Sequence, residues 1–227
     1  MGAKSRREEL EDPSQYRSLE AYVEGVVAAF GATTRECWLG MFGTSPTTQT
    51  TGAMAIQSRR RKFNSSWLFL PQAFAWARTA KPEQPLTTGV WHGNWSDAQN
   101  LEPSTKEQLE LSDVISFHDY GVSSVFEKHV KSLEQYHRPL ICTEYMARAN
   151  NSTFEGTLPI AKDHKVGAIN WGFAAGKTQT YLPWDSWQRP YVGRSPTLWF
   201  HEIFHEDGVA YLPSEVVFIR KMTGKGE

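Results

Sequence analysis

The amino-acid sequence predicts an α/β fold of alternating strands and helices, and three observations support this. Short runs rich in β-branched and aromatic residues recur at an even spacing after residue 85. Helix-start signals lie between consecutive runs. Most positions of each run are apolar, as in parallel strands that are covered by helices, whereas a strand with one solvated face would alternate.

Four segments are predicted to be strands. Their centres lie about 25 to 28 residues apart, which leaves room for a strand, a helix and two loops in each repeat. No glycine-rich phosphate loop follows any of them in the sequence, which disfavours a nucleotide-binding sheet. The four segments are residues 85–91, 113–118, 138–144 and 166–171.

Helices are predicted between the strands and before the first of them. Ser104–Glu107, Ser124–Glu127 and Ser152–Glu155 each fit the S/T-x-x-E capping box, in which two unpaired donors at a helix start are satisfied reciprocally. Nearer the start, Leu19–Phe30 and Leu70–Arg78 have the apolar spacing of amphipathic helices.

Polar and aromatic residues at the predicted strand ends favour a (β/α)₈ barrel over an open sheet. In a barrel these ends converge on one mouth, which carries the active site. Since a complete barrel takes about 250 residues, we expect residues 1–227 to form one incomplete barrel domain from the region of strands four to eight, with strand four doubtful and strands one to three absent. Residues 1–15 are expected to be poorly ordered.

Composition limits the classes of partner. The net charge of −1 disfavours nucleic-acid binding, and no run is apolar enough to cross a membrane. Cys37 and Cys142 form neither a disulfide framework nor a metal-binding spacing, so neither a cofactor nor a metal is expected. Residues 1–10 are charged and have no apolar stretch, so they are not expected to act as a signal peptide. The cellular location and the oligomeric state stay open.

Five motifs together resemble glycoside hydrolase clan A, in particular the family 5-like cellulases and xylanases. The resemblance implies a retaining glycosidase that cleaves the O-glycosidic bonds of a plant-type β-glycan, either glucan or xylan. The motifs are Gln84–Trp91, Ser116–Tyr120, Arg138–Tyr145, Asn170–Gly172 and Lys177–Trp187.

The resemblance also implies roles for individual residues. Glu144 takes the place of the nucleophile at the end of strand seven, and His118 and Tyr120 orient it and contact the sugar. The side chains that line the substrate site are then Trp91, His92, Asn170, Trp171, Trp184, Asp185 and Trp187.

The second carboxylate that a retaining glycosidase needs is not found. The family carries it in an Asn-Glu-Pro motif, which this sequence lacks. Back-translation of Leu39–Gln49, read from the third base, gives Trp-Asp-Val-Trp-Asn-Glu-Pro-Asp-Asn-Pro. We therefore hypothesise that residues 36–69 are translated out of frame and that activity is impaired; an uninterrupted family reading of the gene would disprove the frameshift.

Two other functions stay open. The first is a non-catalytic barrel remnant that binds glycans through its tryptophans, with Asp185 either accepting from a sugar hydroxyl or capping a helix. The second is a zinc peptidase, because His201-Glu202-x-x-His205 would place two histidines one turn apart on a helix from Pro196 to Asp207.

Overall fold

The computed structural model describes residues 14, 16–31, 69–91 and 94–225, which form two compact units, Met1–Ile115 and Ser116–Glu227. Apart from Phe69, the anomalous segment 36–69 lies outside the described residues, as do residues 1–15 except Ser14. No helix among the described residues is long and apolar enough to cross a membrane.

Two helices predicted near the start of the sequence are present among the described residues of the first unit. Helix α2 (Tyr16–Gly31) covers the predicted segment 19–30, and residues 69–79 form a second helix. Their buried apolar side chains belong to one cluster, in which the rings of Tyr16, Phe69 and Trp76 meet edge to face. Helix α4 (Pro103–Leu111) follows and buries Leu109.

The predicted strand 85–91 is not a strand in the structure, which shows only isolated bridge residues there. The backbone N–H of Leu86 donates to the Asp113 carboxylate (2.8 Å), and the backbone N–H of Thr88 donates to the hydroxyl of Ser112 (3.1 Å). For these two N–H groups the acceptors are side chains, whereas the carbonyl of Leu86 accepts from the backbone N–H of Asp113 at 2.7 Å. This prediction was wrong because apolar composition does not show where backbone hydrogen bonds go.

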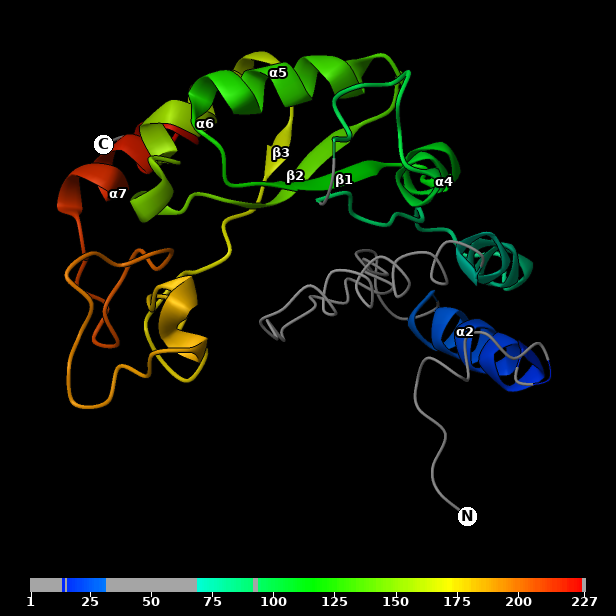
Figure 1. The fold of residues 1–227 in the computed structure, drawn as a ribbon, viewed down its shortest axis with the longest axis horizontal. Helices are drawn as coiled ribbons and strands as arrows, with labels where there is room; N and C mark the ends of the chain where they lie inside the picture. The colour runs from blue at the N-terminus through cyan, green and yellow to red at the C-terminus, as the bar shows by residue number, and fades with distance from the viewer. Residues whose placement is uncertain (1–13, 15, 32–68, 92–93, 226–227) are drawn as a thin grey trace. The chain divides into compact units, whose positions relative to one another are not determined.

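The second unit contains a three-stranded sheet in the order β1-β2-β3. Its strands are β1 (Ile115–Asp119), β2 (Leu140–Tyr145) and β3 (Gly167–Ala168), and β2 and β3 run parallel. Helix α5 (Ser123–Glu134) connects β1 to β2, and α6 (Phe154–Asp163) connects β2 to β3 (Figure 1). The sheet confirms the predicted α/β alternation and three of the four predicted strands.

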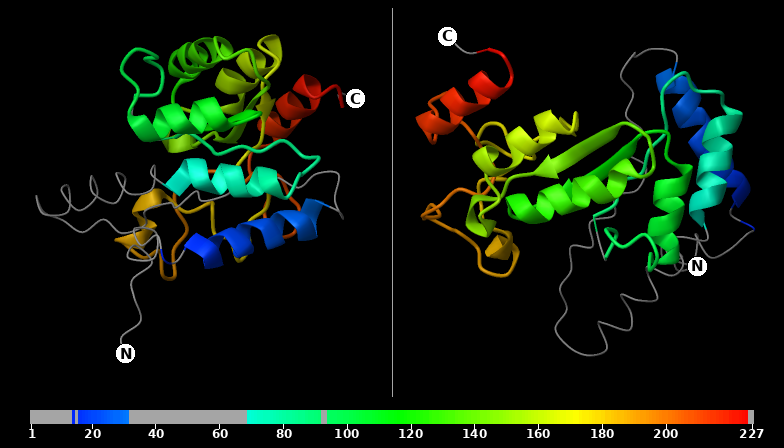
Figure 2. Two further views of the ribbon diagram at one scale, coloured as in Figure 1. Left: turned by 90° about the vertical axis from the view of Figure 1, so that its right-hand side faces the viewer. Right: turned by 90° about the horizontal axis from the view of Figure 1, so that it is seen from above.

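The helices of this unit pack in succession. Helix α5 contacts β2, α6 contacts both α5 and β3, and α7 (Pro213–Met222) contacts α6, as Figure 2 shows from two further sides. In α5 the buried residues Phe126, Val130 and Leu133 recur every three to four positions, so one apolar face covers the sheet.

Two of the three predicted capping boxes lie inside helices and the third overlaps the start of α6, but none caps its helix as predicted. Helices α4 and α5 begin after Glu102 and Val122, and neither has a side-chain cap. Helix α6 is capped by Thr153, which accepts from the backbone N–H of Gly156 at 3.1 Å, and not by Ser152. A serine followed three residues later by glutamate therefore marked the helices but not their first residues.

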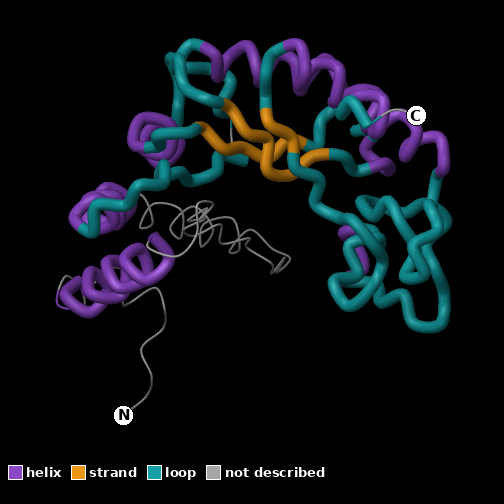
Figure 3. Tube along the Cα trace, turned by 180° about the vertical axis from the view of Figure 1, so that it is seen from behind, coloured by secondary structure: helices purple, strands orange, loops and turns teal. Residues whose placement is uncertain are grey.

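A long irregular segment follows β3 and ends at α7 (Figure 3). It contains one short 3₁₀ helix, η3 (Trp184–Trp187). This segment carries most of the aromatic candidates of the predicted site, so its internal hydrogen bonds decide where those side chains lie.

Candidate active site

The carboxylate of Glu144 lies near the carboxyl end of β2 and is contacted by two residues from the end of β1. The hydroxyl of Tyr120 donates to Glu144 Oε2 at 2.8 Å, and His118 Nδ1 lies 3.2 Å from the same oxygen. His118 and Tyr120 are two residues apart, whereas Phe117 and Asp119 are buried. The two-residue period of an extended chain thus turns both polar rings towards the neighbouring strand.

Burial sets the protonation of this group. Burial lowers the pKa of His118 to about 4, so its imidazole is neutral at neutral pH and the contact with Glu144 is not an ion pair. Burial and the nearby Glu144 carboxylate raise the pKa of Tyr120, which therefore stays protonated and donates. Burial raises the pKa of Glu144, and the Tyr120 hydrogen bond opposes that shift.

Tyr120→Phe is expected to raise the pKa of Glu144, because the lost hydroxyl stabilised the ionised carboxylate and burial then acts unopposed. Titration of the labelled Glu144 carboxyl carbon by NMR measures the change. Tyr191→Phe is the matched control, since the Tyr191 hydroxyl donates instead to Asp185. An unchanged or lower midpoint in Tyr120→Phe would contradict the assigned hydrogen bond.

Trp184 forms an aromatic wall beside this group. Its ring meets that of Tyr120 edge to face, with centroids 5.1 Å apart, and 46% of the residue is exposed. Trp171 is 51% exposed. Half-exposed indole faces are suited to stacking against flat, partly apolar ligands. Asp185 lies inside η3, whose N-cap is Pro183, so it is not the cap residue. Trp187 is the last residue of the same helix.

Asn170 is turned towards the backbone of the long segment. Its side-chain nitrogen donates to the carbonyl of His201 at 3.0 Å and also to that of Gly172. Its Oδ1 is buried and has no hydrogen-bond partner among the described residues. The amide therefore ties the end of β3 to the segment around His201.

The zinc-helix alternative is wrong in its structural premise. Residues 196–207 are not helical, and His201 uses both ring nitrogens: Nδ1 lies 2.7 Å from the carbonyl of Met146, and Nε2 lies 3.1 Å from Trp184 Nε1. His205 instead packs its ring on Trp199, with centroids 4.4 Å apart. Among the described residues no three His, Cys, Asp or Glu gather as a metal site.

The remaining two candidates lie in the first unit or outside the described residues. Trp91 belongs to the first unit and is 40% exposed. His92 lies outside the described residues. The group formed by His118, Tyr120, Glu144 and Trp184 lies within the second unit.

Two further polar contacts of the second unit were not predicted. The Asp119 carboxylate lies 2.6 Å from His129 Nδ1, and this contact joins β1 to α5. Arg148 pairs with Glu215 of α7 through two contacts, Nε to Oε1 at 2.9 Å and a second terminal nitrogen to Oε2 at 2.6 Å. Arg148 and Glu215 are 67 residues apart in sequence, so no local pattern links them.

Fold and site together define an α/β protein with a partly buried, hydrogen-bonded carboxylate at the carboxyl end of a parallel strand. An endo-β-1,4-mannanase from Thermotoga petrophila has a similar structure, with a TM-score of 0.57 and 14% identity over 98% of this chain and 52% of the mannanase. A β-glucuronidase from Bacteroides uniformis is similar with a TM-score of 0.45 and 14% identity, over 66% of this chain and 19% of that chain.

No family model and no curated protein matches this chain. At 14% identity, the likeness to the mannanase shows a similar α/β fold. The chain spans 52% of the length of that mannanase and 19% of that of the glucuronidase.

Proposed function

We propose that this chain carries the nucleophile of a retaining glycosidase of the family 5-like type, acting on a β-linked glycan. The observation that supports this best is the Glu144 carboxylate at a strand end, with the Tyr120 hydroxyl 2.8 Å and His118 Nδ1 3.2 Å from the same oxygen. In this proposal β1, β2 and β3 are strands six, seven and eight of an incomplete (β/α)₈ barrel.

The geometry supports a defined nucleophilic step. Tyr120 and His118 both lie on Oε2, which holds the carboxylate plane and leaves Oε1 to attack the anomeric carbon. The new bond joins Oε1 to that carbon as the bond to the leaving oxygen breaks, giving a covalent glycosyl-enzyme. The exposed faces of Trp171 and Trp184 supply stacking surfaces for sugar rings.

In the family 5-like pattern, the second carboxylate belongs to an Asn-Glu-Pro motif that would fall within residues 36–69. This sequence lacks that motif. A sugar leaving group needs a proton from that acid, whereas a dinitrophenolate leaves without one. The proposed activity is therefore impaired towards glycans but retained towards activated aryl glycosides. Glycan binding without cleavage, through the half-exposed Trp171 and Trp184, is the second candidate function.

Dinitrophenyl β-glucosides, β-xylosides and β-mannosides offered to the full chain separate the two candidates. We expect a burst of dinitrophenolate stoichiometric with the chain, followed by slow turnover, because the missing base slows hydrolysis of the intermediate. Mass spectrometry of the stopped reaction should find the glycosyl group on the peptide that contains Glu144.

The control variant is Glu206→Gln, which removes an exposed glutamate of the same unit and should leave the burst unchanged. A saturable change of tryptophan fluorescence with oligosaccharides that carry no dinitrophenyl group, together with no release of dinitrophenolate from the glycosides, would favour the binding function. A glycosyl adduct on another carboxylate would refute Glu144 as the nucleophile.

A further inference from the structure

His201 joins the turn after β2 to the wall formed by Trp184. Its Nδ1 lies 2.7 Å from the carbonyl oxygen of Met146, which can only accept, so Nδ1 carries the proton. Its Nε2 lies 3.1 Å from Trp184 Nε1, which can only donate, so Nε2 carries none. The ring is 1% exposed and is thus a neutral imidazole with a single tautomer.

The ring of Tyr120 packs against both members of this hydrogen-bonded pair. Tyr120 lies 5.1 Å from Trp184 and 5.3 Å from His201, and Trp184 lies 5.9 Å from His201, all between ring centroids. Tyr120 also donates to Glu144. The half-exposed indole of Trp184 therefore contacts the ring of Tyr120, which donates to the Glu144 carboxylate. Trp184 is also hydrogen-bonded to His201.

Met146 has a backbone conformation that needs support. It lies two residues after Glu144, is fully buried, and has a φ of 66°. A non-glycine residue in this left-handed region is strained and persists where its surroundings hold it. The hydrogen bond from His201 holds the Met146 carbonyl in this turn.

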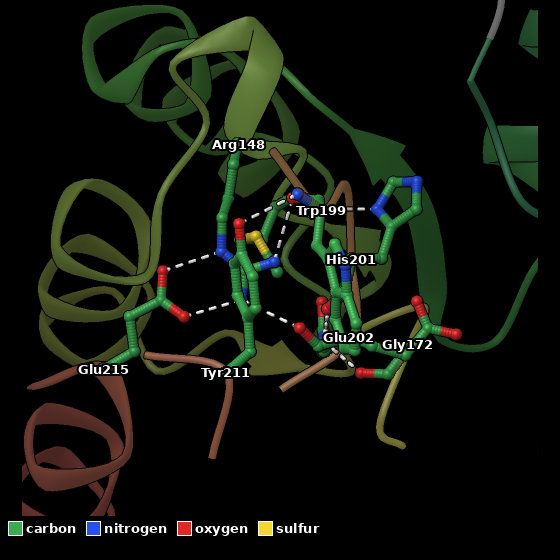
Figure 4. Close-up of polar contacts among 9 residues, drawn as sticks. Arg148, Gly172, Trp199, His201, Glu202, Tyr211 and Glu215 are labelled. Carbon is green, nitrogen blue, oxygen red and sulfur yellow. Dashed lines mark hydrogen bonds and ion pairs between the residues drawn. The ribbon is translucent and has the colours of Figure 1, made fainter. Parts of the chain in front are cut away.

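The backbone around His201 is itself anchored, as Figure 4 shows. Arg148 donates to the carbonyls of Trp199 (3.1 Å) and Glu202 (2.9 Å), and its guanidinium is paired with Glu215. Gly172 allows the close approach of this segment, since a Cβ there would lie 2.9 Å from the backbone nitrogen of Glu202. His201 is therefore held on a fixed backbone before any ligand binds.

We propose that His201 is a positioning residue with two separable effects: its Nε2 orients the Trp184 face that stacks on a sugar, and its Nδ1–H holds the Met146 turn that places Glu144. The part that concerns the sugar rests on the proposed glycosidase function. The part that concerns Trp184 and Met146 rests on the hydrogen bonds alone.

Two substitutions separate the two bonds. An asparagine amide nitrogen can occupy the place of His Nδ1 and still donate to Met146, but it does not reach Trp184. A glutamine oxygen can occupy the place of Nε2 and accept from Trp184, but the donor to Met146 is lost. His164→Asn is the matched control, because His164 pairs with Glu134 on the surface of the same unit.

The first readout needs no catalysis. In the parent chain, nitrogen NMR of the labelled imidazole should show His201 protonated on Nδ1 alone. The signal of the Trp184 indole N–H is identified by its loss in Trp184→Phe. In His201→Asn this N–H should exchange with solvent about tenfold faster than in the parent, as expected for one lost hydrogen bond. In His201→Gln its exchange rate should stay within about twofold of the parent rate. His164→Asn should leave this exchange unchanged.

The second readout is kinetic and uses the dinitrophenyl glycoside burst. His201→Asn should raise several-fold the substrate concentration that gives a half-maximal burst rate, and its saturated rate constant should stay within about twofold of the parent value. His201→Gln should instead lower the saturated rate constant about tenfold. If both variants changed the half-maximal substrate concentration and the saturated rate constant in proportion, His201 would have only a general structural role. That result would overturn the proposal.

The two readouts also distinguish this proposal from the proposed function. A parent chain without any burst would count against Glu144 as a nucleophile, and the exchange result would still decide whether His201 orients Trp184. Protonation of His201 on Nε2, or equal indole exchange in His201→Asn and the parent, would overturn the positioning role whatever the activity.

Discussion

Glu144→Ala is expected to lower the saturated rate of dinitrophenolate release by about a thousandfold or more, since a well-oriented intramolecular nucleophile is worth an effective molarity of at least about 10⁵ M. The substitution removes the oxygen that bonds to the anomeric carbon. It leaves Tyr120 and His118 without the acceptor that both contact in the parent chain. Stopped-flow absorbance of the released phenolate measures the change.

Added azide supplies the control within the same variant. The alanine leaves room on the side of the sugar from which Glu144 attacks, so azide should form a bond to the anomeric carbon as dinitrophenolate leaves. The product is a glycosyl azide of inverted configuration, and release should recover in proportion to azide concentration. Equal release by Glu144→Ala and the parent, without azide, would show that another group attacks.

The predictable part of the fold is the part with local signals. The α5 segment shows the helical apolar period at Phe126, Val130 and Leu133, and β2 is a short apolar run bounded by polar residues. The segment 85–91 has a similar composition and is not a strand; the backbone N–H groups of Leu86 and Thr88 donate to the side chains of Asp113 and Ser112. Which partner a backbone group finds is a tertiary property that composition does not carry.

The same distinction applies to the candidate site. His118, Tyr120 and Glu144 were predicted to lie together because residues at the ends of adjacent parallel strands converge, and the structure places them within hydrogen-bonding distance. In the sequence His201 indicates a zinc motif, because the spacing of two histidines is a local signal. Its actual partners, Met146 and Trp184, lie 55 and 17 residues away, and no spacing rule identifies them.

Arg148→Met should destabilise the second unit by about 3–5 kcal/mol, because it leaves the carboxylate of Glu215 buried without its partner. Both side chains are nearly inaccessible, at 4% for Arg148 and 7% for Glu215. The ring of Tyr211 also lies over the guanidinium, 5.0 Å from its central carbon. Chemical denaturation of the full chain, followed by circular dichroism, measures the loss.

Arg78→Met is the matched control, because Arg78 pairs with Asp113 at 2.9 Å while 49% and 40% of the two side chains are exposed. An exposed pair of this kind contributes about 0–1 kcal/mol. The double variant Arg148→Met with Glu215→Leu should recover much of the lost stability, since it removes the unpaired charge together with its partner. Similar losses for Arg148→Met and Arg78→Met would show that the buried pair has no special weight.

The same substitution connects stability to the site. Without Arg148, the carbonyls of Trp199 and Glu202 lose the donor that fixes the backbone on both sides of His201. The Trp184 indole N–H should then exchange faster in Arg148→Met, at temperatures where the unit is still folded. His201 would keep both of its own hydrogen-bonding groups in this variant, so faster exchange would show that the Trp184 wall depends on a buried ion pair that touches neither Trp184 nor Glu144.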